Sequence, residues 1–150
     1  MDIAIESVTQ AWPDLDKLLH DYFERTIAKE GLPPLRMNWL AYVELDNRGD
    51  LIAVTARGKD HELLGFIMYH IYPHLHHMGV VNAACDIIAV GVDYRGAGIA
   101  RRMMRFAEPV LKSRGVRFVT HQFRTGYTDE PLFPKLGYRL IEHAYVKEID

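Results

Sequence analysis

The chain has 150 residues, of which 49% are hydrophobic and 25% are charged, with a formal net charge of −2. This length predicts a single domain over residues 1–150, and the composition is typical of a globular protein. The charge argues against a nucleic-acid surface, and no apolar run approaches the roughly 20 residues of a membrane span. A lone cysteine, Cys85, excludes an internal disulfide, and residues 1–3 lack the start of a signal peptide, so we expect a cytoplasmic protein.

The first third of the chain predicts a short strand followed by two helices. Apolar residues alternate over residues 3–8, which favours a strand. From Pro13 to Ile27 they recur at spacings of three and four, as in an amphipathic helix that ends at Gly31. A second, shorter helix is predicted over residues 38–45, before a turn at residues 47–50.

The remainder predicts strands mixed with helices. Strands are expected at residues 51–56 and 63–72, joined by a hairpin turn, and the apolar run at 85–92 reads as a strand buried on both faces. A helix begins at Ile99, bends at Pro109 and ends at Gly115. We then expect a strand at 116–123, a short helix at 128–136, and a last strand or hairpin at 137–149. Strands and helices do not alternate strictly, which predicts an α/β (α+β) fold with a mixed sheet.

The most informative stretch is the glycine-rich turn between the buried strand and the Ile99 helix. It reads Arg95-Gly96-Ala97-Gly98. The first N–H groups of a helix have no partner within that helix, and the helix dipole adds positive charge at the same place. Such a turn binds phosphate, and Arg101 and Arg102 add formal charge nearby.

In this turn and its flanks, the chain resembles the GNAT acyltransferase superfamily. The family's phosphate motif is Arg or Gln, two residues, Gly, one residue, then Gly or Ala, which corresponds here to residues 95–100. Leu136-Gly137-Tyr138 resembles the family's leucine-glycine-aromatic return into the sixth strand. The combination of residues 73–76 with Asn82 and Asp86 further resembles a subgroup of small acetyltransferases encoded by bacteriophages.

The resemblance implies the GNAT acyl-CoA N-acyltransferase fold, with acetyl-CoA lying between splayed fourth and fifth strands. The gap would open between residues 88–92 and 119–122, and Gly91 fits a β-bulge. The pantetheine arm would pair with the backbone of Val90 and Val92. The pyrophosphate would lie on the N–H groups of the turn. The implied cofactor-binding residues are Val90, Val92, Arg95, Gly96, Ala97, Gly98, Ile99, Ala100 and Arg101.

In the family an amine attacks the thioester directly, and a Tyr four residues before the leucine-glycine-aromatic glycine protonates the thiolate. The chain has Phe133 at that position, which has no proton to donate. Tyr127 from the preceding loop is our candidate for this general acid, with Tyr138 or a water as alternatives.

Two residues are candidates for the general base. Asp86 shares a strand face with Ala84, where the family most often carries its carboxylate; the other interpretation is a structural acceptor for a nearby N–H or histidine. His121 lies beside the expected gap and has a suitable intrinsic pKa, but it equally fits a half-buried strand residue.

Trp39 on the second helix and His76 in the histidine-rich stretch at 70–77 are the acceptor-site candidates. Core packing is the other interpretation of Trp39. The histidines also suggest zinc, but structural zinc sites usually combine Cys with His in tight pairs, so we expect no metal.

We therefore predict an acetyl-CoA-dependent N-acetyltransferase acting on a primary amine of a small molecule or protein. No nucleic-acid or membrane partner is expected, and the protein is a monomer or homodimer. The alternative is a catalytically silent CoA-binding module that acts through protein contacts. A nucleotide-binding domain is disfavoured because the turn lacks the Lys-Ser/Thr of a nucleoside triphosphate loop.

Overall fold

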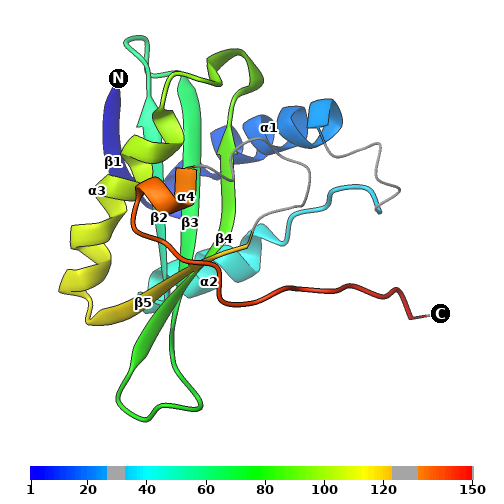
Figure 1. The fold of residues 1–150 in the computed structure, drawn as a ribbon. Helices are drawn as coiled ribbons and strands as arrows, with labels where there is room; N and C mark the ends of the chain where they lie inside the picture. The colour runs from blue at the N-terminus through cyan, green and yellow to red at the C-terminus, as the bar shows by residue number, and fades with distance from the viewer. Residues whose placement is uncertain (27–32, 123–131, 150) are drawn as a thin grey trace.

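A computed structural model describes residues 1–26, 33–122 and 132–149 (Figure 1). In chain order the elements are β1 (Asp2–Glu6), α1 (Val8–Thr26), α2 (Trp39–Arg48), β2 (Leu51–Arg57), β3 (Leu63–Pro73), β4 (Val81–Val90), a 3-10 turn η2 (Val92–Tyr94), α3 (Ile99–Ser113), β5 (Val116–His121) and α4 (Leu132–Lys135). No helix in these ranges is both long and apolar enough to span a membrane.

The strands form one sheet in the order β1-β2-β3-β4-β5, in which only β4 and β5 run parallel. The predicted mixed sheet is therefore confirmed. Successive side chains of a strand point to opposite faces, and β2 shows this directly. Ile52 and Val54 pack with α3, whereas Leu51 and Ala53 pack with α1. The sheet thus lies between α3 on one face and α1 with α2 on the other.

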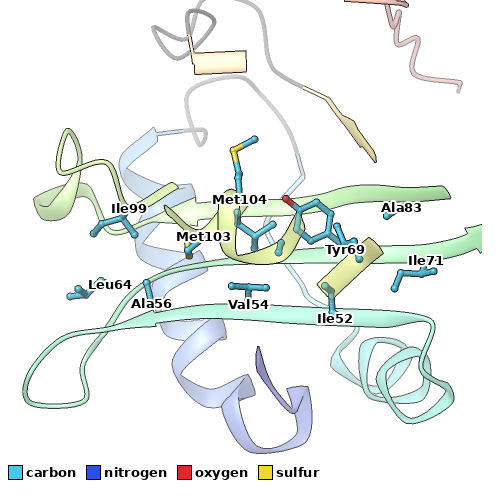
Figure 2. Close-up of a cluster of buried hydrophobic side chains, with 13 residues drawn as sticks. Ile52, Val54, Ala56, Leu64, Tyr69, Ile71, Ala83, Ile99, Met103 and Met104 are labelled. Atoms are coloured by element: carbon cyan, nitrogen blue, oxygen red, sulfur yellow. The ribbon is translucent and has the colours of Figure 1, made fainter. Parts of the chain in front are cut away.

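The α3 face holds the larger core, which Figure 2 shows in close-up. Met103 and Met104 of α3 are buried against strand residues such as Val54 and Tyr69. The apolar period that predicted this helix is the stripe that faces the sheet. Pro109 lies inside α3, and the helix continues through it to Ser113. Gly115, with φ of 79°, follows the helix end as predicted.

The first helix begins earlier than the sequence predicted. Val8, which the sequence predicts in the first strand, is the first residue of α1, and Pro13 lies inside the helix and not at its start. Two tertiary contacts explain the difference. The side chain of Val8 is fully buried, and its N–H donates to the Asp46 carboxylate of α2 at 2.8 Å. Asp46 therefore supplies an acceptor that no residue near the start of α1 provides.

The second helix begins and ends where its local signals indicate. The Asn38 side chain accepts a hydrogen bond from the N–H of Ala41 at 3.3 Å, as an N-cap does. Gly49 at its other end has φ of 77°, a left-handed conformation that glycine adopts without a steric penalty.

Two other predictions of strand boundaries are wrong. β4 starts at Val81 instead of Cys85, because its first residues pair with the end of β3 across a short loop. Residues 139–149 form no strand, and this segment runs away from the body of the molecule in Figure 1. Alternating apolar residues favour a strand, but a strand also needs a hydrogen-bonding neighbour, and Leu140 and Val146 are instead 78% and 99% exposed. Of the predicted helix at 128–136, residues 132–135 are helical, and residues 128–131 lie outside the described part of the chain.

Candidate active site

The glycine-rich turn joins the end of β4 to the start of α3. The Gly91 N–H donates to the Leu64 carbonyl at 2.9 Å, which continues the β3–β4 pairing one residue beyond the strand. Gly96 and Gly98 then take φ values of 81° and 71°, a region that L side chains rarely adopt. These two positive φ values turn the chain into α3.

Within the described residues, the backbone N–H groups of residues 96–101 donate no hydrogen bond. The first helical bond at this end runs from the Arg102 N–H to the Gly98 carbonyl at 3.1 Å, and no side chain caps the helix. Gly96 and Ala97 are exposed, so their N–H groups are accessible from solvent. The turn therefore has the donors that an anion such as a pyrophosphate requires.

The Arg95 side chain holds the turn against α1 instead of extending over it. Its guanidinium donates to the Thr26 hydroxyl at 2.9 Å and lies 5.2 Å from the centre of the Tyr22 ring. Arg25 of the same helix pairs with Asp93 at 3.2 Å. Arg95 thus reaches from the glycine-rich turn to α1, and Arg25 reaches from α1 to Asp93 just before that turn. Together the two contacts join the last turn of α1 to the glycine-rich turn.

The predicted bulge exists, but at a different residue. Met68 of β3 pairs with Ile87 and the next residue, Tyr69, pairs with Cys85, so Asp86 is the extra residue of β4. Gly91 lies beyond the strand. Val92 also lies beyond it, in η2, so the strand edge expected to pair with pantetheine ends at Val90.

The last described pair between the fourth and fifth strands comes one residue before the bulge. Their parallel pairing runs from Val81–Val116 to Cys85–His121, where β5 ends, and residues 123–131 lie outside the described part of the chain. Residues 119–121, which the sequence predicts along the gap, are paired with β4. Residues 86–90 of β4 lie beyond the last described pair with β5.

Asp86 lies where two cavities adjoin, on the sheet face that carries α1 and α2. The larger, of about 220 Å³, lies between α2 and the sheet and is lined by Asn38, Ala41, Tyr42, Leu45, Leu51, His70 and Asp86. The smaller, of about 160 Å³, lies at the end of the β4–β5 pairing and is lined by His70, Ala84, Cys85, Asp86, Thr120 and Gln122. The carboxylate is exposed and accepts a hydrogen bond from the Tyr42 hydroxyl at 2.5 Å. Burial is the main reason that the pKa of Tyr42 is raised, so this phenol stays neutral.

His121 is on the opposite face of the sheet. Its Nε2 lies 3.3 Å from the Tyr69 hydroxyl, and its ring packs edge-on against Tyr138 at 5.1 Å. Its Nδ1 is buried without a hydrogen-bonding partner among the described residues. Burial lowers the pKa of His121 to about 4, so the ring is neutral at pH 7 and is a weak base.

The candidates for the general acid lie near this histidine or outside the described residues. Phe133 of α4 is 5.3 Å from the His121 ring and 5.7 Å from the Tyr138 ring, measured between centroids. Tyr127 lies outside the described residues. Tyr138 is therefore the tyrosine that the structure places next to Phe133. Burial is the main cause that raises the pKa of Tyr138 to about 12.

The two acceptor-site candidates do not line either cavity. Trp39 donates from its indole to the Asp16 carboxylate at 2.6 Å, which ties α2 to α1. His76 is exposed in the β3–β4 loop, where its N–H donates to the His74 ring. The described residues contain no cluster of His, Cys, Asp or Glu able to hold a metal ion.

The histidine that does adjoin Asp86 is His70. In the sequence, His70 is simply the first histidine of the stretch at 70–77. Strand register identifies it, because His70 pairs with Ala84 on β4, two residues from the bulge. Spacing along the chain holds no information about that register.

Comparison with known proteins agrees with this geometry. The profile of the Acetyltransferase (GNAT) family matches residues 12–138. The chain therefore belongs to the GNAT acetyltransferase family. No protein of curated function matches it in sequence.

Solved structures share the fold at low sequence identity. A ribosomal-protein-alanine N-acetyltransferase from Brucella melitensis biovar Abortus 2308 superposes with a TM-score of 0.73 at 21% identity, covering 99% of this chain and 100% of that one. An aminoglycoside acetyltransferase from an uncultured soil metagenomic sample gives 0.78 at 20%, covering 99% and 98%. A transcriptional regulator from Bacillus halodurans C-125 gives 0.79 at 18%, covering 99% and 100%. At these identities the likeness establishes the fold, and the resemblance to bacteriophage enzymes stays a prediction.

Proposed function

We propose that the protein transfers an acetyl group from acetyl-CoA to a primary amine. The observation that carries this proposal is the row of N–H groups at residues 96–101 that donate to none of the described residues, near a strand whose described pairing with β5 ends beside two cavities. An anion held at the turn and an acceptor held at Asp86 would then approach each other along β4. Membership of the GNAT family supports the same reaction.

The residues present fit acetyl-CoA. Gly96 and Gly98 bring bare backbone to the position of the pyrophosphate, and a side chain added at either glycine would meet no protein atom within 4 Å. Val90, the last residue of β4, offers backbone for the amide-rich pantetheine arm. Acetyl-CoA supplies a thioester carbonyl that a neutral amine can attack, releasing a thiol.

The side chains of the site divide the remaining tasks. Asp86 lines both cavities, which supports a role in holding the amine before it loses a proton. His121 remains a candidate base, but its neutral, buried ring favours a role in shaping the thiol side of the gap. Tyr127 stays our candidate for the proton donor to the thiolate, with Tyr138 as the phenol next to Phe133.

A substitution in the turn tests the position of acetyl-CoA. Gly98→Glu places a carboxylate where the pyrophosphate would lie, and we expect calorimetry to show no binding of CoA. Gly115→Glu is the matched control, because Gly115 has φ of 79° and open space around it at the other end of α3. Both variants carry a backbone strain of about 1–2 kcal/mol. Equal CoA affinity in the two variants would remove the pyrophosphate from this turn.

A CoA-binding module without catalysis is the second candidate, and Phe133 favours it because this side chain cannot protonate a thiolate. Release of free CoA thiol, assayed with a broad panel of amines, separates the two. Turnover on any amine supports the transferase. Tight CoA binding with no turnover on every amine tested supports the module.

A further inference from the structure

The larger cavity is lined by one carboxylate, by the polar side chains of Asn38, Tyr42 and His70, and by the apolar residues Ala41, Leu45 and Leu51. Asp86 is the acidic residue among the described residues that line it, and neither cavity is lined by a lysine or arginine. The hydrogen-bonding partner of Asp86 is the phenol of Tyr42, which carries no charge to balance the carboxylate. A cation is therefore the ligand that the carboxylate is suited to bind.

The other lining residues determine which organic group can carry that cation. Ala41 and Leu45 of α2 and Leu51 of β2 face the cavity with hydrocarbon only. Methylene groups that these side chains cover leave water, which favours binding. Against these three residues, hydroxyl groups on a sugar amine would lose hydrogen bonds to water without replacement, and only Asn38, Tyr42 and His70 elsewhere in the lining could bond them. A carboxylate beside the amine would be repelled by Asp86.

We propose that this cavity binds the end of an unbranched aliphatic primary amine, with the alkyl stem against Ala41, Leu45 and Leu51 and the ammonium between Asp86 and His70. The proposal rests on the proposed acetyl transfer and specifies its acceptor. A lysine side chain and a free alkylamine share this chemistry. Both present a straight methylene chain that ends in an ammonium.

His70 is placed to take the proton that the ammonium must lose. It lines both cavities, so it lies between the amine and the end of the described β4–β5 pairing. One N–H bond of the ammonium breaks, the proton joins a ring nitrogen of His70, and an imidazolium and a neutral amine result. Asp86 then faces the imidazolium instead of the ammonium, so the negative charge stays balanced throughout.

The test begins with acceptors of different chemistry. With acetyl-CoA present, n-hexylamine and the amide of Nα-acetyl-lysine should be acetylated with a kcat/KM at least tenfold above that of glucosamine or alanine. If a lysine-containing peptide has a higher kcat/KM than hexylamine, the acceptor is a protein lysine. If hexylamine has the higher kcat/KM, the acceptor is a free alkylamine. Preference for glucosamine or alanine would overturn the amine class while leaving acetyl transfer intact.

Variants then test the two residues separately. Asp86→Asn should raise the KM for hexylamine at least tenfold with the affinity for acetyl-CoA unchanged. His70→Gln should lower kcat at least tenfold and remove the acidic limb of its pH profile. The matched controls are Asp60→Asn in the exposed β2–β3 hairpin and His143→Gln in the exposed C-terminal segment, which should behave as wild type. An unchanged pH profile in His70→Gln would exclude the proton transfer.

A direct measurement keeps binding separate from turnover. Calorimetry of n-hexylamine with the wild-type protein and with Asp86→Asn should show binding that is lost in the variant. Equal binding to both proteins, or none to the wild type, overturns the proposed cavity ligand. Failure of acetyl-CoA itself to bind would instead overturn the proposed function.

Discussion

At the scale of single residues, two titratable side chains near the end of the described β4–β5 pairing have opposite surroundings. Asp86 is exposed at the bulge and bonded to a phenol, whereas His121 is enclosed by Tyr69, Phe133 and Tyr138 on the other face. From the sequence, both residues are candidates for the general base. Their surroundings support Asp86 on the amine side and an uncharged ring on the α3 side.

The buried histidine should make stability depend on pH. His121 has a pKa of about 4 in the folded protein against 6.5 as its ordinary value, so between these values the unfolded chain binds a proton that the folded one does not. The free energy of unfolding should therefore fall as the pH drops from 6.5 to 4, by up to about 3 kcal/mol from this group. Urea unfolding at several pH values measures this.

His121→Phe keeps an aromatic ring in the same packing and should lose that part of the pH dependence. His143→Phe in the exposed C-terminal segment is the control and should retain it. If His121→Phe follows the same curve as the wild type, the ring is not held neutral by burial.

At the scale of elements, contacts between helices and strands define the site. The last turn of α1 holds the glycine-rich turn through Arg25 and Arg95, while its first turn is held by Asp46 of α2. The α2 helix in turn carries Tyr42, the partner of Asp86. The binding turn and the acceptor cavity are therefore connected through the same pair of helices.

Asp46 offers a test of this connection. Asp46→Ala removes the acceptor of the buried Val8 N–H, and we expect a loss of about 1 kcal/mol in the free energy of unfolding. Asp46→Asn keeps an oxygen acceptor and should lose less. Thermal or urea denaturation of the two variants measures the difference, and equal losses would show that the hydrogen bond to α1 does not matter.

At the scale of the whole molecule, ligand binding should stabilise the fold. A ligand that binds the folded chain alone at a hundred times its Kd adds about 2.7 kcal/mol to the free energy of unfolding. We expect acetyl-CoA to raise the Tm, and ATP at the same concentration to raise it less, because the turn lacks the lysine of a triphosphate loop. NAD should also raise it less, because it has no pantetheine arm to pair with β4. A larger shift with ATP or NAD would contradict acetyl-CoA as the ligand.

The C-terminal segment is the part of the molecule where sequence and structure differ most. Its alternating apolar residues predicted a strand, yet Leu140, Tyr145 and Val146 are exposed and unpaired with the described strands. An alternating apolar pattern indicates which face of a strand would be buried. A strand also needs a neighbouring strand with which its backbone can form hydrogen bonds.

The features that could be predicted from the chain are those that depend on residues close together in it. The glycine-rich turn, the cap at Asn38 and the periodic face of α3 all depend on residues within a few positions of one another. Three features became known from the folded chain alone: Asp86 is the bulge, His70 lines the same cavities, and His121 lies on the other face. The physical reason is strand register, because a shift of one residue exchanges the two faces of a strand, and that register is fixed by contacts between segments far apart in the chain.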